Sequence, residues 1–359
     1  MVLCLALQLG AAATGHAKST YVYVHDSNAA AAIWAFSMDK GGNLTPLPNS
    51  PFALIDLPGD CGGSCQTMAY SSKRKVLVTS GPTGLTSWIV AKDGSLSPVT
   101  GSPFSSGGGS DYVGTAVVQA GKRAFAYSAS FDTDEAYGFE IMPDGTLPAL
   151  PGAPGPTGVG PVGMEARKRL LFVGDQDGLS VSTFAVGKDG SLTPAPGSPV
   201  ALPGASFIFT VNADPKGKRL YVHDDGDDTG GLIYGFNVDK RSAALSTVSG
   251  SPFRTFPVGR KTGLAVAKKI LLAFDIRDET NDIQPFRIGK GGVLTETGTI
   301  ISSRLLIDVH WIDPKGKRLI VAGPTMIVTA KVAKDGSPET SDVDFFPNIS
   351  PTAIVVVKR

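Results

Sequence analysis

A turn-and-strand motif recurs along the chain and constrains its fold more than any other feature. The clearest copy is Asp214-Pro-Lys-Gly-Lys-Arg-Leu-Tyr-Val222, and it returns almost unchanged at Asp313–Val321. Pro215 sets φ for a turn, Gly217 can adopt a positive φ, and the apolar run that follows favours a strand. Weaker copies lie at residues 73–78, 121–127, 167–173 and 268–273. Copies of one turn-strand unit along a whole chain indicate a repeat architecture.

A hairpin after a later strand gives the period of the repeat. Its turn position is occupied, in chain order, by Gly42, Gly94, Gly145, Gly190, Ser242, Gly292 and Gly336, at spacings of 44 to 52 residues. Six residues before each turn position stand Phe36, Trp88, Phe139, Phe184, Phe236, Phe286 and Ala330. Four of the hairpins read Asp-Gly, a strong short-range hairpin signal. Units of this length with about four strands each are typical of propeller blades.

Counting strands predicts how the ring closes. Candidate innermost strands precede copies two to seven at residues 66–70, 115–119, 162–166, 208–212, 263–267 and 307–312. Copy one has none before it, whereas Pro351–Val357 reads as an innermost strand at the other end of the chain. We therefore expect an all-β, seven-bladed propeller of four-stranded antiparallel blades over residues 18–359. The C-terminal strand would complete the first blade, and the aromatic column would lie between blades.

Composition excludes some functions and leaves others open. Charged residues make up 18% of the chain and the net charge is +1. Such a balance argues against nucleic acid or an anionic membrane surface as a partner. The 44 glycines and 26 prolines fall at fixed offsets between strand-like runs, so they indicate turns and not disorder. No stretch has the roughly 18 apolar residues that a membrane-spanning helix needs.

The N-terminal segment resembles a secretion signal. Residues 1–17 are apolar, then small, and end in Gly15-His16-Ala17, although the usual positively charged start is absent. The pattern predicts a signal peptide and a periplasmic or secreted protein, or a cytoplasmic one if the segment is not a signal. Cys4 would leave with it. Cys61 and Cys65 flank Gly-Gly-Ser and could form a small-loop disulfide or remain two thiols.

Three sequence patterns carry a resemblance to a known family. They are the Asp214–Val222 motif, the Asp189-Gly-Ser-Leu192 hairpin, and the Gly-Ser-Pro-Phe ends at Gly101–Phe104 and Gly250–Phe253. With them, residues 19–359 resemble the lactonase-type propellers, which include bacterial 6-phosphogluconolactonase and the carboxymuconate-cyclising enzymes. The resemblance implies hydrolysis of a small sugar-acid lactone with no metal or cofactor. It also extends to propellers without catalytic activity, so the motifs favour the fold more than the function.

One part of the family pattern is missing. Enzymes of this family typically carry a Pro-Arg-His run where an innermost strand begins, and the best match here is Pro161-Val162-Gly163. The departure favours the alternative function, a non-catalytic binding or scaffold propeller of the cell envelope with a protein partner. The lactonase hypothesis keeps a small, anionic lactone as the ligand.

Acidic and histidine side chains on the innermost strands are the candidate catalytic groups. Asp308 and His310 are two residues apart on one strand, so they share a face, and together they could activate water. Glu165 is the other acid on an innermost strand. The column of His310 is apolar in other copies, so a buried structural histidine is the alternative interpretation.

Further candidates lie at strand ends and in loops. His25 and His223 occupy one repeat position, each followed by an aspartate, and could bind substrate or could be exposed strand-end residues. Arg260 and Lys261 could meet an anionic ligand at the channel mouth, or be ordinary surface charge. The acidic loops that follow second strands could bind Ca²⁺, but a solvated acidic rim is the simpler prediction, so we expect no metal site.

Overall fold

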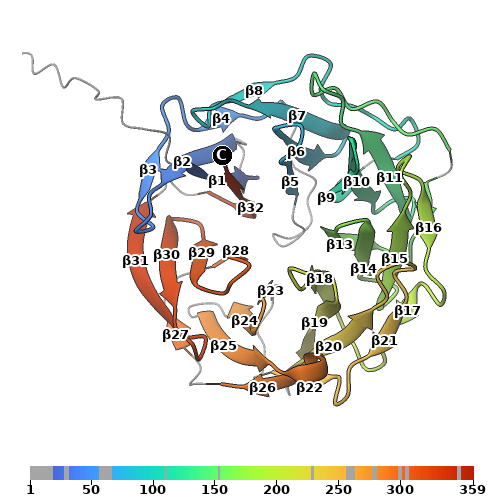
Figure 1. Cartoon of the computed structure of the whole chain (residues 1–359), viewed down its shortest axis with the longest axis vertical. Helices are drawn as coiled ribbons and strands as arrows, with labels where there is room; N and C mark the ends of the chain where they lie inside the picture. The colour runs from blue at the N-terminus through green and yellow to red at the C-terminus, as the bar shows by residue number, and fades with distance from the viewer. Residues whose placement is uncertain are drawn as a thin grey trace, which may run out of the picture.

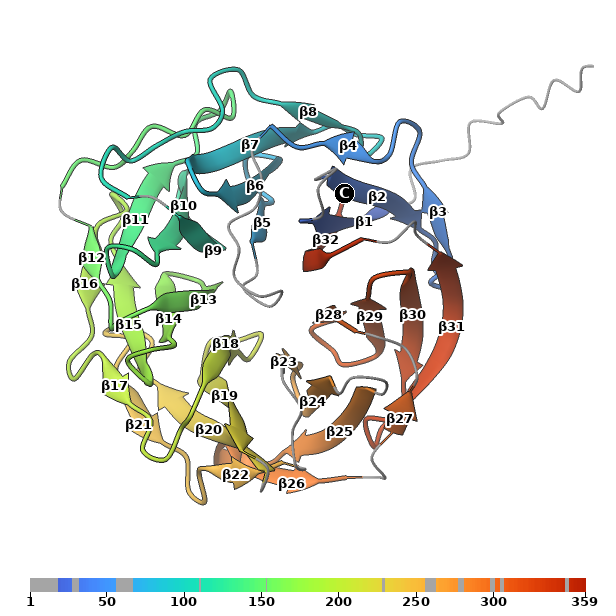
Figure 2. The same cartoon turned by 180° about the vertical axis from the view of Figure 1, so that it is seen from behind.

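Seven small antiparallel β-sheets are arranged in a ring around one axis (Figure 1). The opposite view in Figure 2 shows the same ring, with an inner strand of every sheet lining its centre. The computed structural model describes residues 19–27, 32–55, 67–109, 111–152, 154–227, 230–255, 263–276, 281–297, 301–303, 307–345 and 349–359. The predicted seven-bladed propeller is confirmed.

Each blade runs from an innermost to an outermost strand. Blade 1 contains β32 (Pro351–Lys358), β1 (Thr20–Asp26), β2 (Ala32–Met38) and β3 (Leu44–Pro46). Blade 2 contains β5 (Met68–Ser71), β6 (Val76–Gly81), β7 (Gly84–Val90) and β8 (Leu96–Pro98). Blade 3 contains β9 (Tyr112–Ala120), β10 (Arg123–Ser130), β11 (Glu135–Glu140) and β12 (Gly155–Pro156). Blade 4 contains β13 (Pro161–Arg167), β14 (Leu170–Asp175), β15 (Ser180–Val186) and β16 (Leu192–Pro194).

The remaining blades follow the same order. Blade 5 contains β18 (Ile208–Ala213), β19 (Arg219–Asp227), β20 (Gly230–Val238) and β21 (Leu245–Thr247). Blade 6 contains β23 (Gly263–Val266), β24 (Ile270–Ile276), β25 (Asn281–Ile288) and β26 (Leu294–Glu296). Blade 7 contains β28 (Val309–Ile312), β29 (Arg318–Ala322), β30 (Met326–Val332) and β31 (Pro338–Phe345). Short outer strands are β4 (Phe52–Ala53), β17 (Val200–Ala201), β22 (Phe253–Arg254) and β27 (Ile301–Ser303). Among the described residues the one helical segment is η1 (Lys290–Gly292), and none of their helices could span a membrane.

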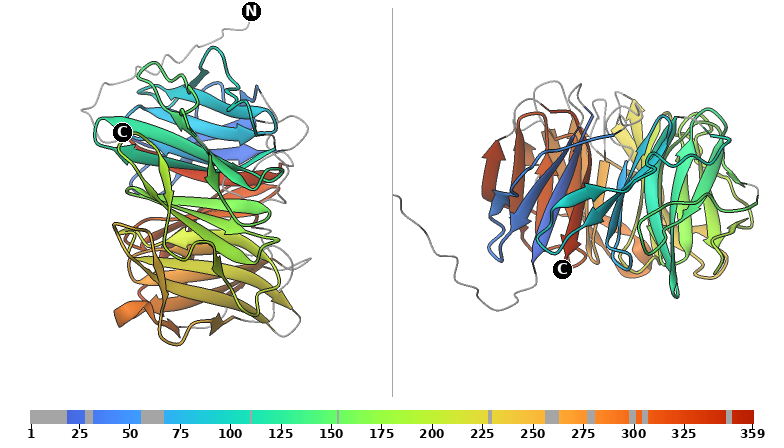
Figure 3. Two further views of the ribbon diagram at one scale, coloured as in Figure 1. Left: turned by 90° about the vertical axis from the view of Figure 1, so that its right-hand side faces the viewer. Right: turned by 90° about the horizontal axis from the view of Figure 1, so that it is seen from above.

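The two ends of the chain close the ring, as predicted. The C-terminal strand β32 pairs antiparallel with β1, with Tyr23 opposite Val355. This pairing completes blade 1 and links residues more than 300 positions apart. The side views in Figure 3 show the strands running across the thickness of the ring, so that turns and loops gather on its two faces.

The aromatic column forms the contacts between neighbouring blades. Phe184 is fully buried in a cluster that contains residues of blades 3 and 4. Every other member of the column, Ala330 included, is also buried, each in a separate cluster that joins its blade to the preceding one. Burying one large apolar side chain contributes about 1.5–3 kcal/mol. The aromatic residue that recurs once in each sequence repeat therefore packs between neighbouring blades.

Buried tyrosine hydroxyl groups connect three of the hairpins to the preceding blade. The Tyr221 hydroxyl, from the motif that opened the sequence analysis, donates a hydrogen bond to the carbonyl oxygen of Gly292 at 2.8 Å. Tyr23 and Tyr127 make the same bond to Gly94 and Gly190, each at 2.7 Å. These turn glycines all have positive φ, which L-residues adopt at a cost. The repeated motif thus has a structural role, because its tyrosine holds the hairpin of the next blade.

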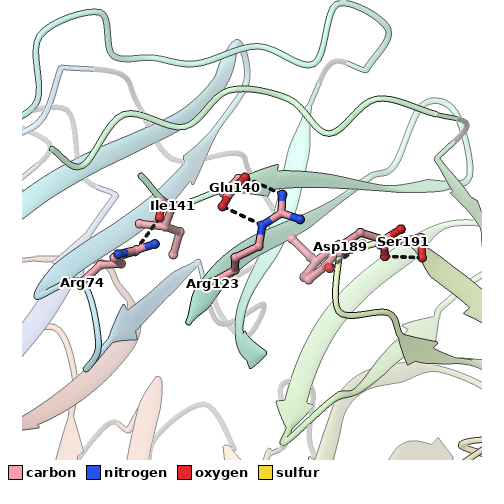
Figure 4. A network of polar contacts seen from close by, with 8 residues as sticks. Arg74, Arg123, Glu140, Ile141, Asp189 and Ser191 are labelled. Atoms are coloured by element: carbon pink, nitrogen blue, oxygen red, sulfur yellow. Dashed lines mark hydrogen bonds and ion pairs between the residues drawn. The ribbon is translucent and has the colours of Figure 1, made fainter. Parts of the chain in front are cut away.

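A partly exposed polar network joins blades 2 to 4 near these hairpins (Figure 4). Arg74 of blade 2 donates to the backbone oxygen of Ile141 at 2.9 Å, and Arg123 forms an ion pair with Glu140. Asp189 accepts a 2.7 Å hydrogen bond from Ser191, and this bond is the first cause of its lowered pKa. Because the charged side chains of this network remain partly open to solvent, their contribution to stability is small.

Candidate functional site

A polar cavity of about 120 Å³ lies at the centre of the ring. Innermost strands of blades 1, 4, 5, 6 and 7 line it. Its polar lining includes Glu165, Arg167, Thr210, Asp308, His310 and Thr352. The three residues predicted as catalytic from the sequence, Glu165, Asp308 and His310, therefore face one space, although they come from blades 4 and 7.

Glu165 is the most deeply buried acid of the cavity wall. It is 6% exposed and forms an ion pair with the guanidinium of Arg167, two residues along β13. Burial raises the pKa of the Glu165 carboxyl, because the charged form loses hydration, while Arg167 acts in the opposite direction. The carboxyl group is therefore a better proton donor near neutral pH than an exposed glutamate.

His310 combines cavity exposure with packing between blades 6 and 7. Its ring is half-buried and stacks on Phe274, with ring centroids 4.3 Å apart and an interplanar angle of 14°. Gly263 makes this position possible, because a β-carbon there would overlap the imidazole. Burial lowers the pKa of His310 to about 4, against a smaller raising effect of a hydrogen bond to the backbone of Leu264. The imidazole is therefore neutral at pH 7 and can accept a proton.

Asp308 lies at the start of the same segment and also lines the cavity. Its backbone N–H donates to the carbonyl oxygen of Ala322 at 2.9 Å, which places it at the beginning of the β28–β29 pairing. Asp308 directly precedes β28, and strand alternation puts Asp308 and His310 on one face of this segment. The predicted juxtaposition of this pair with the central channel agrees with the cavity lining.

His25 and His223 are not exposed strand-end residues, so that interpretation is wrong. Each is 1% exposed, and His25 contacts hydroxyl groups from the innermost segments of blades 1 and 2. Burial lowers the pKa of both imidazoles to about 3. Neither residue is part of the cavity lining itself. Their predicted contact with substrate stays a prediction.

Other predicted residues lie outside the part of the chain that the structure describes. These are Arg260 and Lys261, the proposed anion-binding pair, together with the signal-like segment 1–17 and the cysteines. Among the described residues the cation that lines the cavity is Arg167, and it is already paired with Glu165.

The acidic residues after second strands hold loops in place. Asp224 accepts backbone N–H bonds from Ser206 and Phe207 at 2.7 and 2.8 Å. Asp26 accepts the N–H of Ser350 at 2.9 Å in the same way. These carboxylates fix the loops that lead into innermost strands. No group of three or more potential metal ligands occurs within the described ranges.

Asp175 is one of the acidic residues at the ends of second strands, and the sequence did not predict it as a site residue. It is fully buried at the end of β14, and one carboxylate oxygen accepts hydrogen bonds from Ser180 and Ser182, each at 2.8 Å. Burial raises its pKa to about 7, while the serines lower it. An acidic residue near the end of the second strand was visible as a pattern in four blades, at Asp26, Asp175, Asp224 and Asp275, but its burial depends on neighbouring loops.

Replacing Asp175 by Asn is expected to stabilise the protein at high pH. In the native state Asp175 keeps its proton up to a pKa of about 7, whereas the unfolded chain loses it near 3.8, so this residue contributes less stability as pH rises between these values. At pH 8 the variant should be up to about 4 kcal/mol more stable, and near pH 4 the difference should vanish. Urea unfolding across this range measures it. The exposed hairpin variant Asp189→Asn is the control, and a gain at pH 8 of equal size there would contradict the burial argument.

Solved structures share this fold at low sequence identity. A protein of Bacteroides fragilis described as a "putative 6-phosphogluconolactonase" matches with a TM-score of 0.71 and 15% identity, covering 94% of this chain and 98% of that one. A protein of Bacteroides uniformis with the same description gives 0.68, 16%, 95% and 99%. A Lactobacillus plantarum protein gives 0.70, 14%, 95% and 100%. No protein-family model and no curated protein sequence matches the chain. What these structures share with the chain is the propeller fold.

Proposed function

We propose that this protein hydrolyses a small lactone in the central cavity. The observation that carries the proposal is the pairing of a neutral imidazole with a buried carboxyl group around one space. The pKa of His310 is lowered, so its base form is present at neutral pH, and burial raises the pKa of Glu165, which favours the acid form that a proton donor needs. The Bacteroides proteins that share this fold are each described as a "putative 6-phosphogluconolactonase", and this description supports a lactone as the substrate class.

The chemistry follows from these protonation states. His310 accepts a proton from water as the water oxygen forms a bond to the lactone carbonyl carbon. The ring C–O bond then breaks, and Glu165 donates a proton to the leaving ring oxygen, which yields the open hydroxy acid. The negative charge of Asp308, on the same face of β28, favours the imidazolium that forms. For a lactone that carries an anionic substituent, Arg260 and Lys261 are the proposed partners of that group.

A non-catalytic binding propeller is the second candidate. The run Pro161-Val162-Gly163 lacks the arginine and histidine of the family pattern, and Glu165 is engaged by Arg167. In this alternative the protein is a binding or scaffold propeller of the cell envelope with a protein partner. Both candidates keep the proposal of export, which rests on residues 1–17.

A pH-stat assay with gluconolactone and related sugar lactones separates the two candidates. Hydrolysis by the wild-type protein should exceed the buffer rate, and Asp308→Asn should lower kcat by about tenfold or more. The rate should fall below pH 4, where His310 becomes protonated, and should fall again at high pH as Glu165 ionises. A wild-type rate equal to the buffer rate, or equal rates for both proteins, would overturn the catalytic proposal.

A further inference from the structure

One repeat position carries a buried histidine in two blades, and the two histidines have different surroundings. In blade 1, His25 Nδ1 lies 2.7 Å from Thr67 Oγ1 and 3.0 Å from Thr352 Oγ1. In blade 5, neither ring nitrogen of His223 has a hydrogen-bond partner among the residues that the structure describes. Buried polar groups are nearly always paired, so the arrangement in blade 5 calls for an explanation.

The difference arises from two residues of the innermost strands. The positions that carry Thr352 and Thr67 in blades 1 and 2 carry Phe209 and Gly263 in blades 5 and 6. Both hydroxyl partners are therefore missing from the sequence. The space over Gly263 is taken by the ring of His310. After burial, repulsion between the protonated forms of the two imidazoles is the second cause of the lowered pKa of His223. The two histidines are thus electrostatic neighbours.

Thr210 connects this pair to the cavity. It lies directly opposite His223 in the β18–β19 pairing, so both side chains are on one face of blade 5. Thr210 lines the central cavity, and its buried hydroxyl also has no hydrogen-bond partner in the described part of the chain. Two residues with unused donors and acceptors therefore lie beside the space that His310 faces.

We propose that Thr210, His223 and His310 form a recess that binds hydroxyl groups of a neutral, polyhydroxylated ring. This inference rests on the proposed function and specifies its substrate class. A neutral imidazole offers one donor and one acceptor, and so does a threonine hydroxyl, which matches the hydrogen-bonding capacity of an alcohol. A ligand hydroxyl would take the role that Thr67 and Thr352 play for His25.

The charges around the cavity favour a neutral ligand over an anion. Its described lining contains two carboxyl groups, Asp308 and Glu165, and one guanidinium that is already paired. A buried imidazole that resists protonation offers no positive charge to a carboxylate or phosphate. A sugar lactone without a phosphate group therefore fits this recess better than a phosphorylated one.

Calorimetric titration at pH 7 with 1,5-anhydroglucitol tests the recess, because this neutral ring polyol has no bond to hydrolyse. It should bind the wild-type protein more tightly than gluconate does. His223→Phe and Thr210→Val should each weaken binding by about tenfold, the effect of losing one or two hydrogen bonds. Thr210→Val is the smaller change and keeps the test valid if His223→Phe folds poorly.

A melting experiment distinguishes a binding role from a structural one. His223→Phe should melt at the same or a higher temperature than the wild type, since it removes an unpaired buried group. The matched variant His25→Phe should melt at a lower temperature, because it removes the imidazole that hydrogen-bonds both Thr67 and Thr352, which keep the 2.9 Å hydrogen bond to each other. Unchanged affinity in both binding variants, tighter binding of gluconate, or no binding of the polyol would overturn the inference. The pH-stat assay measures hydrolysis independently of these binding results, so failure of the proposed function and failure of this inference can be told apart.

Discussion

Lowering the pH from 6.5 to 4.5 is expected to reduce the free energy of unfolding by about 3 kcal/mol. His25 and His223 have pKa values of about 3 in the folded protein and ordinary values near 6.5 when unfolded. Below pH 6.5 the unfolded chain therefore binds protons that the native state excludes. Each histidine lowers stability by about 1.4 kcal/mol per pH unit in this window.

Asp175 opposes this loss and sets its net size. Its native pKa of about 7 lies above the unfolded value of 3.8, so the native state binds an extra proton between these values and gains stability as the pH falls. One group of this kind offsets about 1.4 kcal/mol per pH unit, against about 2.7 for the two histidines. His310 and Glu165 also act with opposite signs. The contribution of the two histidines is therefore the larger one, and the free energy of unfolding falls as the pH is lowered.

Urea unfolding at half-unit pH intervals measures this dependence. In His223→Phe one of the two histidine contributions is absent, so the loss between pH 6.5 and 4.5 should shrink by about 2.7 kcal/mol. In Asp175→Asn the opposing group is absent, and the loss should grow by a similar amount. Stability that is flat across this range in all three proteins would show that the histidines are not buried in their neutral forms.

Truncating Phe184 to Ala is expected to cost about 3–5 kcal/mol of stability, the usual range for a buried phenylalanine. Phe184 is fully buried between blades 3 and 4, where the chain cannot collapse around the cavity without shifting two sheets. Urea unfolding at pH 7.5 measures the loss.

Two variants provide the controls for this experiment. Phe184→Leu keeps most of the buried volume and should cost much less than the alanine variant. Thr193→Ala, at an exposed position on the neighbouring strand β16, should change stability by less than about 0.5 kcal/mol. A loss below about 1 kcal/mol for Phe184→Ala would contradict the assignment of the aromatic column to the contacts between blades.

The fold was predictable from short-range patterns in the sequence. Hairpin glycines and the aromatic residues six positions before them recur with the blade, because every blade must turn at the same place and bury the same face. Even the exception obeys this rule: where Ser242 replaces glycine, the adjacent Ala243 takes the positive φ of 63°. Ring closure by Pro351–Lys358 followed from counting strands.

The candidate site was only partly predictable. Alternation along one strand placed Asp308 with His310, and the scarcity of acids on innermost strands drew attention to Glu165. The roles of Thr210 and Thr352 were missed, although polar residues in mostly apolar innermost strands were a visible signal. The buried state of His25 and His223 was also missed, because a strand end next to a loop resembles an exposed position.

The sequence by itself determined the number of blades, their strand order and the hairpins, since local turn chemistry and the repeat period specify them. Only the tertiary structure decided which polar groups meet. His25 finds Thr67 and Thr352, which are 42 and 327 residues away, whereas His223 finds His310 across Gly263. Burial, hydrogen-bond partners and pKa depend on side chains that different blades bring together, and no pattern within a single repeat contains that information.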